Sequence, residues 1–347
     1  MTMTATATAA AAATSRACTA VAGTNIALVK YWGKRDAALN LPATGSLSLT
    51  LAELGTRTTV RFGGRGPGGD RVRLGGAEAD QRFAFRVSQF LDLVRREAGI
   101  ADAAEVVTEN SVPTAAGLAS SASGFAALAL AASRAAGLAL APAALSGLAR
   151  RGSGSAARSI FGGFVEMARG AQDDGSDSVA RAIAEPGAWE LRLVVAMTAA
   201  TEKALGSTAA MERTARTSPF YPAWVAGSDG DLAEARAAIA ARDLEALGRV
   251  AERSALRMHA TAMAADPAIV YWNAATLAAM HTVFDLRAGG VAAYVTIDAG
   301  PHVKALCAAA DAERVAAALG ATPGVLRTLV ASPGAGARVI EETVTKG

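Results

Sequence analysis

The chain has 347 residues, which at roughly 150 residues per domain predicts two domains and a sizeable core. Its two cysteines, with no CxxC pair or Cys/His cluster, argue against a disulfide framework or a structural zinc site and fit a reducing compartment. The net charge is +3, from 34 basic and 31 acidic residues without a basic stripe. This balance speaks against nucleic-acid binding and is compatible with a small phosphorylated substrate.

An uncharged run from residue 110 to residue 133, in a chain that is 52% hydrophobic, raises the question of a membrane span. A span needs about 20 strongly apolar residues, whereas this run contains a proline, serines, glycines and much alanine. The first 14 residues lack the basic and leucine-rich regions of a signal peptide, so we expect residues 1–16 to be a disordered tail. We therefore expect a cytoplasmic protein that does not enter the membrane.

The first half of the chain is predicted to be rich in strands and to contain several helices. Strands are expected at residues 19–28, 46–54, 57–62 and 105–110. Helices are expected at residues 84–98, 120–136 and 142–150. A Gly/Ser segment at residues 153–159 leads into a hydrophobic strand at residues 160–167.

A Pro/Gly turn at residues 185–187 marks a change in character, after which helices predominate. Strands are expected at residues 191–197 and 291–297, and helices at residues 232–241, 244–264, 269–288, 302–309 and 312–319. This order predicts an α+β chain with two layers.

The segment Pro113-Thr114-Ala115-Ala116-Gly117-Leu118-Ala119-Ser120-Ser121 has the composition of a phosphate-binding loop. Small residues before a helix let backbone N–H groups approach an anion, and the helix N-terminus adds partial positive charge. The serines supply hydroxyls for phosphate or for a bound cation. The segment is neither a Walker A loop nor a G-x-G-x-x-G fingerprint. A serine N-cap on a buried Ala-rich helix is the open alternative.

In residues 25–36 a predicted strand runs into a short loop that contains two lysines, an arginine and a tyrosine. Such a group of cations and a phenol suits the binding of an oxyanion substrate. An ordinary solvated basic loop is the alternative.

The segment Gly152-Ser153-Gly154-Ser155-Ala156-Ala157-Arg158-Ser159 places two serines and an arginine where they can hold a carboxylate. A Gly/Ser linker is the alternative, although the hydrophobic strand that follows directly argues against it. Asp298 ends a predicted strand and suits a base or an orienting group, with a turn or N-cap aspartate as its alternative.

Together and in order, these segments resemble one family, the diphosphomevalonate decarboxylases of the GHMP kinase superfamily. The most specific parts are Lys30-Tyr31-Trp32-Gly33-Lys34, which separates these decarboxylases from other GHMP enzymes, and the segment from Arg151 to Ser159. Residues 41–51, 206–211 and 298–304 are also similar.

The resemblance implies a GHMP kinase fold of the α+β class. Residues 17–188 would form a lobe like domain 2 of ribosomal protein S5, and residues 189–347 a ferredoxin-like lobe that carries the catalytic aspartate. The implied reaction converts (R)-5-diphosphomevalonate into isopentenyl diphosphate, ADP, phosphate and CO2, in the mevalonate pathway of isoprenoid biosynthesis. ATP phosphorylates the C3 hydroxyl, the phosphate leaves, and loss of CO2 quenches the positive charge at C3. ATP and Mg²⁺ are the implied cofactors, and a homodimer is the implied assembly.

The resemblance also implies roles for residues at matching positions. Asp298 would be the base or orienting group, Arg158 would hold the substrate carboxylate, and Asn25 would orient one of the two. Lys34 would belong to the catalytic residues as well, and together with Tyr31 it would bind the substrate diphosphate. Further substrate contacts are implied for Trp32, Gly33, Arg82, Ser153, Gly154, Ser155, Ala156, Ala157, Ser207 and Thr208. ATP phosphates would lie at Pro113, Ala115, Ala116, Gly117, Leu118, Ala119, Ser120, Ser121 and Lys203, with Ser121 also near Mg²⁺.

Three positions depart from the family pattern. His302 replaces an Asn of many members, Thr44-Gly45-Ser46 replaces a more polar pair, and Thr208 stands where some bacterial members have Arg. Three other functions stay open: a phosphomevalonate decarboxylase giving isopentenyl phosphate, a GHMP small-molecule kinase without decarboxylation, and a non-catalytic nucleotide-binding protein. His259, His281 and His302 lack metal-ligand spacing and are expected to be structural.

Overall fold

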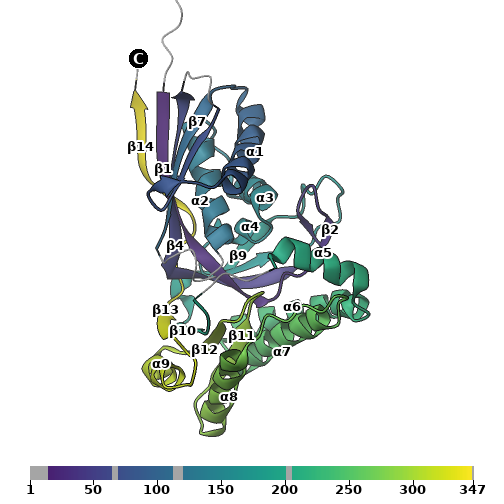
Figure 1. The fold of residues 1–347 in the computed structure, drawn as a ribbon. Coiled ribbons are helices and arrows are strands. Elements are labelled where there is room, and N and C mark those ends of the chain that lie inside the picture. The colour runs from purple at the N-terminus through teal and green to yellow at the C-terminus, as the bar shows by residue number, and fades with distance from the viewer. Residues whose placement is uncertain (1–14, 65–68, 112–119, 201–204, 346–347) are drawn as a thin grey trace, which may run out of the picture.

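A computed structural model describes residues 15–64, 69–111, 120–200 and 205–345, in which strands and helices form two joined layers (Figure 1). The strands are β1 (Ser15–Val29), β2 (Lys34–Asp36), β3 (Leu41–Pro42), β4 (Ser46–Gly64), β5 (Arg71–Leu74), β6 (Ala77–Glu78), β7 (Ala103–Asn110), β8 (Phe164–Met167), β9 (Ala180–Ala184), β10 (Leu191–Met197), β11 (Ala293–Ile297), β12 (Val303–Ala308), β13 (Arg327–Ala331) and β14 (Arg338–Thr345). The helices are α1 (Gln81–Ala98), α2 (Ser120–Ala135), α3 (Pro142–Gly152), α4 (Ala156–Ser159), α5 (Ser207–Thr217), α6 (Tyr221–Ala241), α7 (Leu244–Met263), α8 (Ala274–Ala288) and α9 (Ala312–Gly320).

Two main sheets organise the described residues. The larger follows the order β14-β1-β4-β7-β5-β6, with β8 joined to β4 and β9 joined to β8. The smaller follows the order β11-β12-β10-β13, and all its pairings are antiparallel. The combination of mostly antiparallel sheets, in which only β5 and β7 pair in parallel among the described strands, with packed helices confirms the predicted α+β class.

From Ser120 onward the uncharged run forms most of the buried helix α2, which packs against β1 and β4 (Figure 1). Its alanines at 126, 127, 129, 131 and 132 are fully buried in one core with residues of α1 and the larger sheet. Alanine favours a helix and lets the helix approach the sheet closely. Among the described residues, every helix is too short or too polar to cross a lipid bilayer.

A second core joins the two sheets and holds the ends of β1 and β4 in place. Leu28 and Leu49 of the larger sheet pack in it with Leu193 and Leu306 of the smaller sheet and with residues of α6 and α7. Burial of these side chains stabilises the contact between the layers by roughly 1.5–3 kcal/mol each. The loops that follow β1 and β11 are therefore anchored beside one another.

Several expected elements differ in the structure. The helix expected at residues 302–309 is wrong, because residues 303–308 form β12, paired on both sides by β10 and β11. A short apolar run does not distinguish a buried strand from a helix, and here sheet pairing decides. The strands expected at 46–54 and 57–62 are one strand, β4. The helix expected from residue 269 begins only at Ala274, where Asn273 forms a capping box.

The two chain ends also differ from expectation. Ser15 and Arg16, assigned to a disordered tail, begin β1 because their backbone pairs with β14; residues 1–14 lie outside the described part. β14 belongs to the larger sheet and not to a separate C-terminal lobe, as Figure 1 shows at the C-terminus. The division expected at residue 188 therefore does not hold for the last strand.

Candidate active site

Asp298 follows β11 and lies between two lysine ammonium groups. Lys30 Nζ is 2.8 Å from Oδ1 of the carboxylate, and Lys304 Nζ is 3.0 Å from Oδ2. The lysine side chains are 1% and 3% exposed, whereas Asp298 is 30% exposed, so a ligand can still reach the carboxylate. Lys30 directly follows β1 and Lys304 lies on β12, so packing of the two sheets assembles this group.

The charges of this group are strongly coupled. Burial by itself would raise the pKa of the Asp298 carboxyl, but the charges of Lys30 and Lys304 outweigh it and hold the pKa well below its usual range. Burial lowers the pKa of Lys30 to about 8, and Asp298 offsets only part of that effect. Asp298 is therefore a carboxylate that accepts hydrogen bonds across the physiological pH range.

Arg158 lies on α4 as a fully buried guanidinium with neutral partners. Its Nε donates to Ser48 Oγ at 3.0 Å, its Nη1 to Ser46 Oγ at 2.6 Å and its Nη2 to Asn25 Oδ1 at 3.1 Å. Burial lowers its pKa to about 10, so it remains charged. Within the described part of the chain it forms no salt bridge, which leaves its charge available to an anion.

Asn25 orients Arg158 and does not bond to Asp298. Besides accepting from Arg158, its amide Nδ2 donates to Ser155 O at 2.9 Å and to Ser159 Oγ at 2.8 Å. Three contacts from one side chain fix the position of α4 against β1. Of the two roles expected for Asn25, the geometry therefore favours the one toward Arg158.

Serine hydroxyls connect the start of α2 with the segment before α4. Ser153 Oγ lies 3.3 Å from Ser155 Oγ and 3.4 Å from Ser121 Oγ. Ser121 is exposed in the first turn of α2. The structure thus brings together the two serine-containing segments that the sequence singled out.

Part of the expected ATP site lies outside the described residues. Pro113, Ala115, Ala116, Gly117, Leu118, Ala119 and Lys203 fall in this group. Ser120 begins α2, but only its backbone is described. Of the residues expected to bind ATP, Ser121 is therefore the one whose side chain can be placed.

Tyr31 and Gly33 lie in a tightly packed loop after β1. The Tyr31 Oη is buried without a hydrogen-bond partner among the described residues, and a Cβ at Gly154 would lie 2.4 Å from it. Gly33 has a φ of +103°, and a Cβ there would lie 2.0 Å from Tyr221 Oη. Only glycine permits both close approaches. Burial raises the pKa of Tyr31 far above its usual range, so its hydroxyl stays a donor.

Three expected contact residues lie in the core. Trp32 is 1% exposed and packs with Met211, Trp224 and Met258, while its carbonyl accepts a 3.0 Å bond from Trp224 Nε1. Ala156 and Ala157 are also fully buried. In these positions their side chains hold the loop and α4 in place. The expected contact of these three residues with substrate stays a prediction, and it would have to be made by their backbone.

Cations gather at the other end of the site, at the start of β2 and on α1. We call Lys34, Arg82 and Arg86 the cation cluster. Burial lowers the pKa of Lys34, with a further contribution from the charge of Arg86. Burial likewise lowers the pKa of Arg86, with a contribution from Arg82. Lys34 Nζ donates to Asn40 Oδ1 at 2.6 Å, and the Arg86 guanidinium lies 5.2 Å from the centre of the Phe125 ring.

The start of α5 carries the two remaining expected contacts. Ser207 is half-buried and Thr208 is exposed. The charge of Glu212, one turn further along, offsets a small part of the lowering of the Lys34 pKa by burial and Arg86, so α5 lies within electrostatic range of the cation cluster. Hydroxyls and helix N–H groups at this end of α5 suit an anion.

Sequence reasoning assigned no role to Lys30, Lys304 or Arg86. Lys30 was visible as a basic residue at a strand end, and Lys304 as the one charged residue in the apolar run 303–308. Arg86 gave no local signal, because an arginine on an amphipathic helix is usually solvated.

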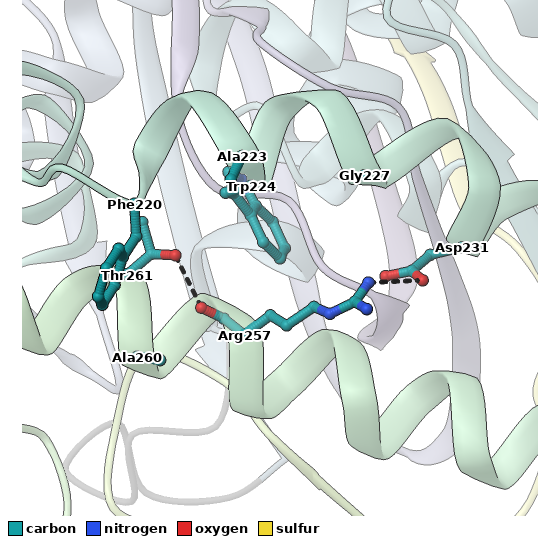
Figure 2. A pocket seen from close by; sticks show the side chains of 8 residues that line it. All are labelled: Phe220, Ala223, Trp224, Gly227, Asp231, Arg257, Ala260 and Thr261. Carbon is teal, nitrogen blue, oxygen red and sulfur yellow. Dashed lines mark hydrogen bonds and ion pairs between the residues drawn. The ribbon is translucent and has the colours of Figure 1, made fainter.

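A separate cavity of about 370 Å³ lies between α6 and α7, as Figure 2 shows. It is lined by Phe220, Ala223, Trp224, Gly227, Asp231, Arg257, Ala260 and Thr261. Arg257 reaches across it to Asp231 at 3.3 Å. None of these residues belongs to the predicted site, so the cavity is not the place where Asp298 and Arg158 meet a ligand.

Two family models match this chain. They are a diphosphomevalonate decarboxylase-like N-terminal domain over residues 22–180 and a mevalonate 5-diphosphate decarboxylase C-terminal domain over residues 193–327. The chain belongs to the diphosphomevalonate decarboxylase family. The diphosphomevalonate decarboxylase of Gibberella zeae is 38% identical over 304 residues, which make up 83% of this chain and 79% of that protein.

Solved structures agree with this family. The mevalonate diphosphate decarboxylase of Staphylococcus aureus is 38% identical, with a TM-score of 0.90 over 94% of this chain and 98% of that chain. A complex described as "MDDEF in complex with MVAPP, AMPPCP and Magnesium" is 41% identical, with a TM-score of 0.88 over 94% of this chain and 99% of that chain. The GHMP kinase fold and the enzyme family expected from the sequence are thereby confirmed.

Proposed function

We propose that this chain catalyses the ATP-dependent decarboxylation of (R)-5-diphosphomevalonate to isopentenyl diphosphate, ADP, phosphate and CO2. Membership in the diphosphomevalonate decarboxylase family supports this reaction. The observation that carries the proposal at the level of chemistry is the presence in one site of a fixed carboxylate, Asp298, and a buried guanidinium, Arg158, whose partners among the described residues are neutral. The chain acts in the cytoplasm as a homodimer in this proposal.

Asp298 accepts a hydrogen bond from the C3 hydroxyl of the substrate and holds its oxygen in line for phosphorylation. Lys30 and Lys304 keep the carboxylate ionised, so the hydroxyl proton has an acceptor when the oxygen is phosphorylated. Positioning of this kind supplies much of the rate in phosphoryl transfer, because little covalent chemistry falls to the protein.

Arg158 binds the substrate carboxylate, assisted by the hydroxyls of Ser153 and Ser155. The hydrogen bonds from Arg158 to Ser46, Ser48 and Asn25 set the plane of the guanidinium before the substrate arrives. When the carboxylate is held in one orientation, the C–C bond that joins it to the substrate can break without reorganisation of the site. Its electron pair then neutralises the positive charge developing at C3 as CO2 leaves.

The cation cluster and Tyr31 bind the substrate diphosphate in this proposal. Lys34, Arg82 and Arg86 bring three positive charges, and the buried Tyr31 hydroxyl lacks a partner among the described residues. Gly33 and Gly154 allow the close packing of that loop, and Ser207 and Thr208 add hydroxyls from α5. Charge-assisted hydrogen bonds of this type are about twice as strong as neutral ones.

The residues at the start of α2 fit ATP and Mg²⁺. Ser121 is exposed in the first helical turn, within 3.4 Å of Ser153 Oγ, and a hydroxyl at a helix N-terminus suits a phosphate or a hydrated cation. The segment from Pro113 to Ser120 and Lys203 would complete the phosphate contacts. Bound Mg²⁺ would neutralise charge on the ATP phosphates.

The test is a simultaneous measurement of ADP and CO2 from the full chain with ATP, Mg²⁺ and (R)-5-diphosphomevalonate. We expect equal amounts of both products. ADP formation without CO2 would identify a small-molecule kinase instead, and the absence of both would identify a non-catalytic nucleotide-binding protein.

A further inference from the structure

We propose that Lys304 is a positioning residue that fixes the second carboxylate oxygen of Asp298, so that the orientation of the carboxylate is set before substrate binds. This inference rests on the proposed function, because it assigns the catalytic carboxylate to Asp298. It adds a residue for which the sequence alone suggested no role.

Each carboxylate oxygen of Asp298 forms an ion pair with a different lysine. Lys30 Nζ contacts Oδ1 and Lys304 Nζ contacts Oδ2, so both oxygens have a charged donor. One donor would leave the carboxylate free to rotate about its Cβ–Cγ bond, whereas two donors on different elements restrain that rotation. Rotation of this group moves the acceptor oxygen relative to the substrate hydroxyl.

Lys304 lies on a strand that is paired on both sides. Its backbone lies in β12 opposite Val195 of β10 on one side and Thr296 of β11 on the other. Lys30 lies after the end of β1 and is held by bonds from its Nζ to Ala27 O at 2.7 Å and from its backbone N to Ser254 Oγ at 3.0 Å. Two well-supported ammonium groups therefore define the carboxylate plane.

Lys304 acts through Asp298 and not by direct contact with substrate. Its side chain is 3% exposed, and Asp298 Oδ2 is its ion-pair partner, whereas Asp298 is 30% exposed. The ammonium group of Lys304 is therefore already paired with the carboxylate, unlike the guanidinium of Arg158, whose hydrogen-bond partners among the described residues are neutral. This difference separates a positioning role from a substrate-binding role.

The other groups that face Asp298 do not replace Lys304. Arg158 acts on it only through charge, since its hydrogen bonds go to Ser46, Ser48 and Asn25. His259 on α7 contacts the Asp298 backbone carbonyl at 3.1 Å, and burial lowers its pKa to about 3, so it is neutral. Lys30 is then the one remaining cation that bonds to the carboxylate among the described residues.

The experiment compares Lys304→Met, which removes charge and hydrogen bond, with Lys304→Gln, which keeps a donor. The control is Leu306→Ala on the same strand, a core residue two positions away. We expect Lys304→Met to lower kcat on the order of 10²-fold, as expected for a misplaced reacting group, with KM changed less than about threefold. We expect Lys304→Gln to lie between it and wild type. Leu306→Ala should lower thermal stability while kcat stays within about threefold of wild type.

A second readout needs no activity. The Asp298 carboxyl carbon, labelled with ¹³C and followed by NMR against pH, reports the pKa of that group directly. Loss of one close opposite charge should raise the pKa by roughly 1–3 pH units in Lys304→Met and should leave it unchanged in Leu306→Ala. If wild type releases no CO2 but the titration shifts as expected, the proposed function fails while the contact stands. The inference would be overturned if the Asp298 pKa were the same in Lys304→Met as in wild type, or if Leu306→Ala lowered kcat as much as Lys304→Met does. If Lys304→Met does not fold, the same pKa measurement on Lys304→Gln tests the inference.

Discussion

The two ends of the site are built in opposite ways. At one end Asp298, Lys30, Lys304 and Arg158 are held by strands and a short helix, and their polar atoms are already bonded within the protein. At the other end the cation cluster lies at the start of β2 and on α1, where burial, and then the charge of a neighbouring arginine, lower the pKa of Lys34 and that of Arg86. The hydrogen bonds and ion pairs of the first end are therefore formed before substrate binds, whereas the positive charges of the second end are placed to bind an anion.

This difference predicts which kinetic constant each end controls. Desolvation of the buried end is completed during folding, so its groups can act on the transition state without rearrangement. The cation cluster contributes attraction that is similar in the ground state and the transition state, which lowers KM without raising kcat. Substitutions at the buried end should therefore lower kcat, with or without a change in KM, whereas substitutions in the cation cluster should change mainly KM.

The largest expected effect is that of Asp298→Ala. Removal of a positioned acid/base group typically costs roughly 10²–10⁴-fold in rate, so kcat should fall by at least that lower bound while ATP and substrate still bind. Steady-state kinetics gives the rate, and calorimetric titration with each ligand gives the binding. Residual turnover above roughly a hundredth of wild type would contradict the role of Asp298.

Arg158→Ala should have the next largest effect, because it removes a buried charge placed for the substrate carboxylate. We expect kcat/KM to fall on the order of 10²-fold or more, with both constants affected. Ser48→Ala removes only the 3.0 Å partner of Arg158 Nε and should cause a smaller loss in the same direction. If Arg158→Ala changed only the affinity for ATP, the carboxylate site would lie elsewhere.

Arg86→Gln tests the other end of the site. We expect KM for the diphosphorylated substrate to rise about tenfold with kcat within about twofold, since one charge-assisted contact is lost. The matched control is Arg96→Gln, an exposed arginine near the other end of α1, which should leave both constants unchanged. A fall in kcat with unchanged KM for Arg86→Gln would erase the proposed difference between the two ends.

The smallest effect on activity is expected for His259→Gln, which instead alters the pH dependence of stability. Burial, and then the charge of Lys30, lower the pKa of His259 to about 3 in the native state. The unfolded chain binds a proton near its ordinary pKa of about 6.5, so wild type loses stability as pH falls below that value. The loss should reach on the order of 2 kcal/mol at pH 5. Urea unfolding at pH 7 and pH 5 should show this loss in wild type and not in His259→Gln; equal losses in both would contradict it.

The sequence predicted individual strands and helices well, but it did not predict which residues of different elements contact one another. The strand Leu191–Met197 and the helix that begins at Ser120 follow from apolar pattern and alanine content, and both were expected at those positions. Arg158 and Asp298 stood out from the Gly/Ser segment and the strand end that carry them, and their roles, with that of Asn25, followed from the family resemblance. Lys304 was missed because its strand was read as a helix, since pairing with β10 and β11 is not a local property. The contact of Lys30 with Asp298 spans 268 positions, so no spacing rule indicates it.

The proposed division of the site is tested most directly by a comparison of kcat/KM for (R)-5-diphosphomevalonate and its monophosphate, in wild type and in Arg86→Gln, with ADP and CO2 both measured. We expect wild type to prefer the diphosphate through a lower KM, and we expect Arg86→Gln to reduce this preference while each ADP remains matched by one CO2. Equal or better turnover of the monophosphate by wild type, or an unchanged preference in Arg86→Gln, would contradict this division.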